Sequence, residues 1–283
     1  MSDGEILVLG AIAGLTIFLG LPVGRMRNLS SEKRALFNAI ATGVLVFLLV
    51  ETLSKGIEPV EVALEHVTVE GGGTWGTFAG QAALFVACFG AGLLGLVYYE
   101  RWMKARGAKV SMGPGAAAAR ELGIAARVHM LSDGRRLALF IAIGIGLHNF
   151  AEGLAIGQSA ASGAVNLALL LIVGFGLHNA TEGFGIVSPL TGEAEIPSWG
   201  FLALLGLIGG GPTFFGTLVG QAWVSDWLNI AFLALAAGSI LYVVVQLIGV
   251  GLKMGHMEML MWGIFIGVVL GFGTDFVLVA AGA

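Results

Sequence analysis

Long runs of apolar residues dominate the chain, and polar residues are concentrated between them. An apolar run of about 20 residues is long enough to cross the hydrocarbon core of a bilayer as a helix. Continuous apolar runs of this length exclude the alternating strands of a membrane barrel. We therefore predict an all-α polytopic membrane protein, with eight transmembrane helices in a bundle that forms a single transmembrane domain over residues 1–283. The predicted spans cover about residues 5–24, 35–55, 77–99, 137–159, 164–188, 199–220, 228–251 and 257–281.

Basic residues fall on one side of this predicted bundle. Lysine and arginine occupy the links after the first, third and seventh spans, and Lys55 is the one exception. Because cytoplasmic links carry the excess of basic residues, we predict that both termini are extracytoplasmic and that residues about 101–136 form a cytoplasmic loop. We expect a multi-pass protein of the cell membrane (plasma or inner membrane), with membrane lipids among its partners.

Composition agrees with a membrane bundle and excludes other classes. Hydrophobic residues make up 57% of the chain and charged residues 11%, a balance unlike that of soluble domains. The 46 glycines suit helices that approach closely within a membrane. The single Cys88 excludes an intramolecular disulfide and a cysteine zinc site. The formal charge of −4 lacks the excess of basic residues that is typical of nucleic-acid binding, so we expect no nucleic-acid partner.

Two near-copies of one polar motif interrupt the fourth and fifth apolar segments. GIGLHNFAEGLAIG covers Gly144–Gly157 and GFGLHNATEGFGIV covers Gly174–Val187, with eight of fourteen positions identical. A charged side chain in a membrane helix costs roughly 2.5–3.5 kcal/mol on insertion scales. A chain that carries the same polar set twice is therefore expected to use it. The repeated polar residues are His148 and His178, Asn149 and Asn179, and Glu152 and Glu182.

The spacing of the motif predicts one shared site. Residues four apart lie on one face of a helix, so each histidine points the same way as its glutamate, and the asparagines flank that face. The link between the two helices is short, which predicts antiparallel neighbours with both motifs near the bilayer midplane. Imidazole, carboxylate and amide oxygen together form a ligand set for a divalent metal ion. The alternative is that these residues only join two helices by hydrogen bonds.

The two motifs, written as HNFAEGLAIG and GLHNATEG, resemble the fourth-helix and fifth-helix motifs of the ZIP family of divalent-metal transporters. Other stretches also look like that family. They are TIFLGLP at 16–22, ATGVL at 41–45, YER at 99–101 and AAGSILYV at 236–243. The resemblance covers most of the chain and extends to eight helices with both termini outside.

The resemblance implies a transport site between the fourth and fifth helices, with one metal position and a second, adjacent one. The implied metal ligands are His148, Asn149, Glu152, His178, Asn179 and Glu182. It also implies import of Zn²⁺, Fe²⁺, Mn²⁺ or Cd²⁺ toward the cytosol by a helix bundle that moves against a scaffold, and it allows a homodimer. The metal is the transported substrate, with Zn²⁺ favoured, and no cofactor is required.

The chain departs from the family pattern at several positions. Ala151 and Thr181 stand where family members commonly have a proline before the motif glutamate. Gly211-Pro212 stands where many have Glu-Pro in the sixth helix, and this difference favours a single-metal site over a two-metal site. Gln246 lies in a part of the seventh helix that is often acidic.

We therefore expect a secondary transporter for divalent transition metals rather than an enzyme. One alternative is a metal sensor that binds without transport, favoured by the missing glutamate at Gly211. A weaker alternative is an intramembrane zinc hydrolase, which would need an open coordination position and an acid or base beside the metal. The chain contains no His-Glu-x-x-His motif, and both motif glutamates are more naturally ligands.

Overall fold

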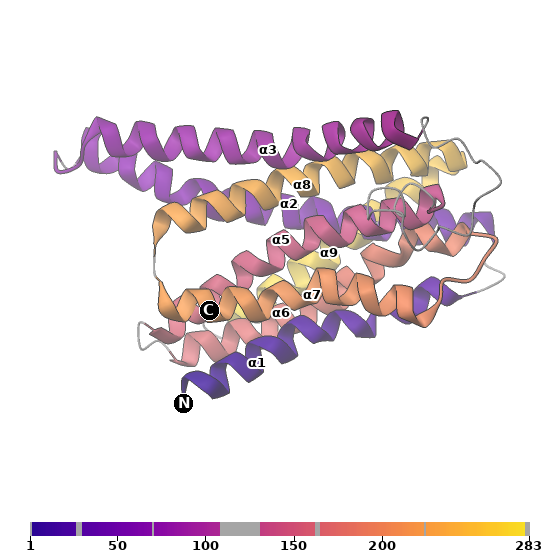
Figure 1. Ribbon diagram of the computed structural model, residues 1–283, viewed down its shortest axis with the longest axis horizontal. Helices are drawn as coiled ribbons and strands as arrows, with labels where there is room; N and C mark the ends of the chain where they lie inside the picture. The colour runs from indigo at the N-terminus through magenta and orange to yellow at the C-terminus, as the bar shows by residue number, and fades with distance from the viewer. Residues whose placement is uncertain are drawn as a thin grey trace.

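Every regular element that the structure describes is helical (Figure 1). The computed structural model describes residues 2–26, 30–69, 71–107, 131–161, 165–223 and 225–280. The longer helices are α1 (Asp3–Leu15), α2 (Ser31–Thr68), α3 (Trp75–Gly107), α5 (Asp133–Ala161), α6 (Val165–Val187), α7 (Trp199–Ala222), α8 (Asp226–Met254) and α9 (Met257–Ala280). The short 3-10 helices are η1 (Thr16–Leu19), η2 (Leu21–Arg25) and η4 (Ser188–Gly192).

Seven stretches of helix in the described residues are long and apolar enough to cross a membrane, which indicates a multi-pass membrane protein. They are Gly4–Arg25, Ser31–Thr68, Trp75–Tyr98, Asp133–Ala161, Trp199–Ala222, Asp226–Met254 and Met257–Phe276. The remaining predicted span, about 164–188, coincides with α6, several of whose side chains lie outside the described residues. Its crossing of the bilayer stays a prediction. The start of α1 and the end of α9 lie at the same end of the bundle (Figure 1).

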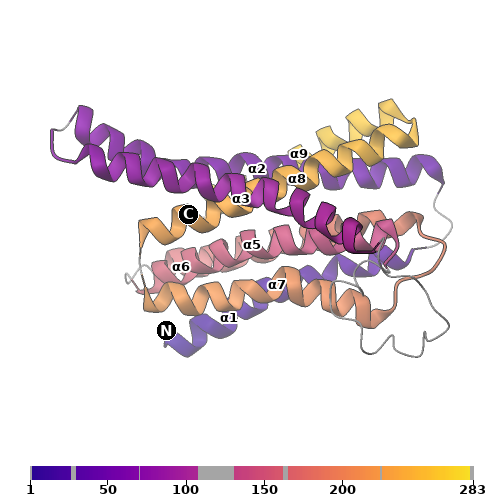
Figure 2. The same ribbon diagram turned by 45° about the horizontal axis from the view of Figure 1, so that its top comes forward.

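Helix α2 is longer than its predicted span, which ended near residue 55. It has 38 residues and continues to Thr68 through the exposed Glu58, Glu61 and Glu65. Glutamate is a good helix former but is not apolar, so hydropathy underestimates the length of such a helix. The α2–α3 hairpin consequently projects beyond the other helices (Figures 1 and 2).

Two other predicted boundaries differ from the structure. The predicted loop at about 101–136 begins and ends in helix, because α3 continues to Gly107 and α5 begins at Asp133. Residues 108–130 lie outside the described residues. The first predicted span is α-helical only to Leu15 and continues as η1 and η2. Pro22 in this segment has no backbone N–H to donate, which disfavours a regular α-helix there.

The helices form two groups that lie side by side (Figure 2). The first group contains α1, α5, α6 and α7, with the most extensive contact between α5 and α7. The second group contains α2, α3, α8 and α9, in which α2 packs along α8 and α9 and α3 packs along α8. The groups meet where α5 contacts α8 and where α6 contacts α2 and α9.

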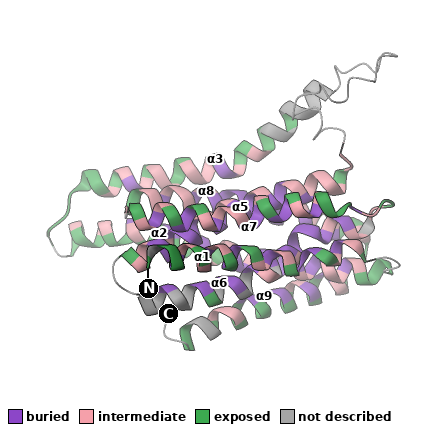
Figure 3. Ribbon diagram, turned by 60° about the horizontal axis from the view of Figure 1, so that its bottom comes forward, coloured by how far each residue is buried: buried purple, intermediate pink, exposed green. Residues whose placement is uncertain are grey.

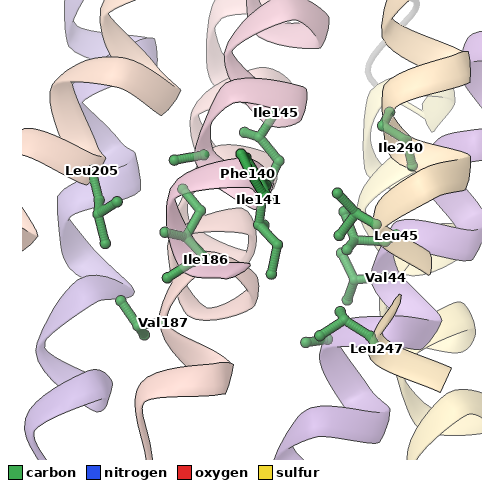
Figure 4. Packing of buried hydrophobic residues seen from close by; sticks show 14 of the residues in the cluster. Val44, Leu45, Phe140, Ile141, Ile145, Ile186, Val187, Leu205, Ile240 and Leu247 are labelled. Atoms are coloured by element: carbon green, nitrogen blue, oxygen red, sulfur yellow. The ribbon is translucent and has the colours of Figure 1, made fainter. Parts of the chain in front are cut away.

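Apolar side chains fill the boundary between the two groups (Figure 4). Ile145 of α5 and Ile186 of α6 belong to one buried cluster with Leu45 of α2 and Ile240 of α8. Contacts of this kind are not directional, so they stabilise the boundary without strongly fixing one register of the helices.

Glycines bring the helices inside each group into backbone contact. In the first group, a Cβ at Gly153 of α5 would collide with the backbone carbonyl of Thr213 on α7. In the second group, a Cβ at Gly43 of α2 would collide with the backbone carbonyl of Ile264 on α9. Close approach of backbones through small residues is a main source of helix association in membranes. Each group is therefore fixed internally by contacts that no larger side chain can replace.

Glycines at the boundary between the groups make looser contacts. A Cβ at Gly144 of α5 would lie 3.5 Å from Cβ of Ser239 on α8, and one at Gly185 of α6 would lie 4.0 Å from Cβ of Ala41 on α2. Both distances are ordinary van der Waals separations. At these glycines the helices are thus packed less closely between the groups than at Gly153 and Gly43 within them.

Large apolar side chains cover much of the outer surface. Figure 3 shows runs of exposed residues along α9 and α3. Trp262 and Phe276 of α9, Val86 of α3 and Leu207 of α7 are each more than half exposed. An apolar surface of this extent is unsuited to water and suits the hydrocarbon of a bilayer.

Candidate functional site

His148 and Glu152 of α5 meet Glu182 of α6 in the interior of the bundle. Nε2 of His148 lies 3.2 Å from Oε1 of Glu152 and 4.0 Å from Oε1 of Glu182. The three residues are 3%, 6% and 0% exposed, respectively. Two carboxyl groups and an imidazole are thus withdrawn from solvent at one point, where an isolated charge is costly and a cation is a favourable partner.

A hydroxyl from the second helix group contacts the other nitrogen of the imidazole. Oγ1 of Thr52 on α2 lies 3.0 Å from Nδ1 of His148, and the two atoms share a hydrogen bond in the buried interior. With Nδ1 engaged, the ring presents Nε2 to the two glutamates. Outer contacts of this kind orient the histidine ligands of metal sites. Thr52 therefore holds the imidazole of His148 from across the boundary between the groups.

Asn149 is oriented by α7, in the turn that precedes Pro212. Its Nδ2 donates to Oε2 of Glu182 and to the backbone carbonyl of Gly209, each at 3.0 Å. Pro212 lies within α7 and has no N–H to donate to the carbonyl one turn earlier, so the helical hydrogen bonding is interrupted in this turn. The carbonyl that Pro212 leaves without this partner is that of Ile208, one residue before the carbonyl to which Asn149 donates.

Asn179 is oriented in a similar way by the end of α1. Its Nδ2 donates to the backbone carbonyl of Ala13 at 3.0 Å. That carbonyl also accepts from Oγ1 of Thr16 at 2.7 Å, and Oγ1 of Thr16 contacts the carbonyl of Gly176 on α6 as well. The repeated asparagines therefore each donate their amide nitrogen to a backbone carbonyl of a neighbouring helix.

The amide oxygens of both asparagines remain as acceptors. Asn149 and Asn179 are fully buried, and Oδ1 of each accepts no hydrogen bond within the described residues. An unsatisfied buried acceptor is uncommon in native structures. Amide oxygens are suitable ligands for divalent cations, so the donor set fits a cation better than it fits a network that serves only to join helices.

Of the six expected ligands, the structure brings four together and turns a fifth toward α1. His148, Asn149, Glu152 and Glu182 form the contacts above, and the amide nitrogen of Asn179 is directed to Ala13. The side chain of His178 lies outside the described residues. Within the described part of the chain, no group of three or more His, Cys, Asp and Glu residues has the arrangement of a metal cluster. In the structure, Nε2 of His148 instead contacts a glutamate oxygen directly.

Gly211 lies on the outer face of α7, away from the site. A Cβ at this position would have no neighbour within 4 Å. Leu207 and Phe215, one turn before and after it, are 57% and 59% exposed. A glutamate at this position would therefore point away from Glu182 in this arrangement of the helices, so no side chain at position 211 completes a second metal position here.

No model of a known protein family matches the chain, and no curated protein matches it. The similarity to the ZIP family thus rests on the motifs quoted above.

The sequence pattern did not point to three contributors to this site, Thr52 and the carbonyls of Ala13 and Gly209. Thr52 is 96 positions from the histidine that it contacts. A threonine in an apolar run and a backbone carbonyl carry no specific signal in a single sequence. Interruption of α7 by Pro212 is the one local feature that predicts available carbonyls nearby.

Proposed function

We propose that the protein is a secondary transporter that moves divalent transition-metal cations across the membrane toward the cytosol. The observation that carries this proposal is the buried contact of His148, Glu152 and Glu182, flanked by two asparagine oxygens that accept no hydrogen bond within the described residues. Burial of such groups within a membrane bundle is expensive and marks a pathway for ions more often than a structural contact.

The chemistry of the donor set selects the substrate class. Two carboxylates neutralise one divalent cation, and an imidazole nitrogen adds a ligand of intermediate softness. Such ligands suit Zn²⁺, Fe²⁺, Mn²⁺ and Cd²⁺ better than Cu⁺, which prefers sulfur, or Mg²⁺, which retains its waters. We propose Zn²⁺ as the first ion to test, held by His148, Glu152 and Glu182, with Asn149, His178 and Asn179 as further ligands.

The arrangement of the helices supports a movement of one group against the other. The first group carries the glutamates and asparagines, and glycine contacts fix it internally. Its boundary with the second group is mostly apolar, apart from the contacts of Thr52 with His148 and of Lys55 with Phe175, and the boundary glycines make only ordinary contacts. We propose that α6 also crosses the membrane, which brings the number of spans to eight. We further propose that the first group moves along the second to expose the site alternately to each side. In this proposal both termini are extracytoplasmic and the protein lies in the cell membrane.

Uptake into liposomes tests the proposal. Purified protein in liposomes loaded with a metal-sensitive dye should accumulate Zn²⁺, Cd²⁺, Mn²⁺ or Fe²⁺ faster than protein-free liposomes, with one or two of the metals preferred. Saturable metal binding without flux of any metal would replace the transporter with a metal sensor. The absence of both binding and flux would reject both functions.

Metal affinity should fall as the pH falls. Protons compete with the metal for imidazole and carboxylate ligands, so a metal ion that displaces one proton loses up to about tenfold in affinity for each unit of acidification. Equilibrium binding of Zn²⁺ to the purified protein between about pH 7.5 and 5.5, a range that spans the ordinary pKa of histidine, measures the slope. An affinity that does not change over this range would contradict ligation by these residues.

A further inference from the structure

One turn of α2 lies directly against the candidate site. Thr52 contacts His148 at 3.0 Å, and Lys55 follows it by three residues on the same face of the helix. Nζ of Lys55 lies 2.6 Å from Oε1 of Glu51, in a salt bridge whose side chains are 50% and 15% exposed, respectively. The lysine is therefore partly solvated, whereas Glu152 and Glu182 are buried.

The charge of Lys55 reaches from the second helix group to the first. Its Nζ lies 5.7 Å from the ring centroid of Phe175, a buried residue of α6, within reach of a cation–π contact. The ammonium also interacts electrostatically with Glu152 of α5 and Asp275 of α9. Lys55 thus pairs with Glu51 one turn from Thr52, on a helix that does not belong to the group carrying the ligands.

We propose that the ammonium of Lys55, held by Glu51 beside the turn that contacts His148, is a tethered counter-cation for the buried charge of Glu152, and that an incoming divalent metal ion must displace it. The inference rests on the proposed function, because it assigns the residue that competes with the transported ion. Lys55 is thereby a residue that determines affinity and specificity.

The physical reason is the difference in charge between the two cations. Two buried carboxylates without a nearby cation are unfavourable in a medium of low dielectric constant. Lys55 offsets part of that charge. A divalent ion supplies twice the charge and direct coordination, so it can replace the ammonium, whereas a hydrated monovalent ion offers neither advantage. Because Lys55 belongs to the second group, its attraction also favours the arrangement in which the site lies beside it.

The first test compares Zn²⁺ binding by Lys55→Met, Lys55→Arg and the wild type. Removal of the charge should tighten Zn²⁺ binding at least about fivefold, the lower end of typical coupling between sites. Lys55→Arg keeps the charge and should remain within about twofold of the wild type. The matched control is Lys253→Met, which removes an exposed lysine from the last turn of α8. Wild-type binding and flux together with unchanged binding by Lys55→Met would overturn the inference and leave the proposed function standing.

The second test needs no metal. Thermal unfolding of the chelator-treated protein in detergent is measured for the wild type, Lys55→Met, Glu152→Gln and the double variant. Lys55→Met should lower the unfolding midpoint less in the Glu152→Gln background than in the wild type, because its partner is then neutral. Additive effects of the two substitutions would overturn the counter-cation role. A wild type that binds no metal would reject the proposed function and the displacement step with it, whereas the coupling would still report whether Lys55 offsets the charge of Glu152.

Discussion

A variant that carries both Glu152→Ala and Glu182→Ala should bind Zn²⁺ at least about a hundredfold more weakly than the wild type and should show no metal uptake. Loss of a partner that merely orients a metal ligand typically costs 10–100-fold in affinity, and this variant loses two direct ligands. It also removes the negative charge that would neutralise a divalent cation in a buried site. Equilibrium binding and dye-based uptake, measured on one preparation, check both parts.

The same variant should remain folded, which separates a functional role of the glutamates from a structural one. The two substitutions relieve the cost of two buried carboxylates but leave a cavity in place of each side chain, and these effects oppose one another. Asn149 also keeps its hydrogen bond to the carbonyl of Gly209 when Glu182 is removed. The unfolding midpoint in detergent should therefore stay close to that of the wild type. A lower midpoint, with flux lost in proportion to folded protein, would favour the alternative in which these residues only join helices.

The matched control for this experiment is Glu58→Ala with Glu61→Ala. Both residues are exposed on the projecting part of α2, so the control removes the same number of carboxylates at a distance from the candidate site. It should bind and transport metal like the wild type. Equal losses in the two variants would show that net negative charge, rather than the buried site, governs uptake.

The helical class was predictable because it depends on the length of apolar runs. Seven of the predicted spans correspond to helices that are long and apolar enough to cross a membrane. The errors occur where the local chemistry changes before the helix ends. Hydropathy could not detect the polar extension of α2 to Thr68, and it does not distinguish the α-helical part of the first span from η1 and η2.

The candidate site was predictable only where the sequence repeats itself. The two copies of the motif indicated that the polar residues of α5 and α6 meet, and Nδ2 of Asn149 does lie 3.0 Å from Oε2 of Glu182. The contribution of α2 could not be read from the sequence, because Thr52 resembles any threonine in an apolar helix. The outward position of Gly211 is set by the rotation of α7, which a single sequence does not determine.

Substitution of a glycine at a helix crossing should have the second large effect, a loss of stability. Gly153→Val should destabilise the protein by about 3 kcal/mol or more, at or above the usual range for overpacked cores. A Cβ at Gly153 would meet the backbone carbonyl of Thr213 and Cα of Gly216, and backbone atoms on a packed helix cannot move aside as a flexible side chain can. The collision would push α5 from α7 and so remove the amide of Asn149 from the carbonyl of Gly209. The yield of monodisperse protein and the unfolding midpoint in detergent measure the effect.

Gly95→Val on α3 is the matched control for this substitution. Position 95 is exposed, and a Cβ there has no neighbour within 4 Å. Both variants introduce the same β-branched residue into a helix interior, so the difference in intrinsic helix propensity cancels between them. Gly95→Val should therefore retain wild-type folding and binding, and Gly153→Ala should fall between the control and Gly153→Val. Equal behaviour of the two valine variants would show that the α5–α7 contact does not hold the first group together. The apolar boundary could then not be regarded as the weaker of the two contacts, and the proposed movement of one group along the other would lose its structural basis.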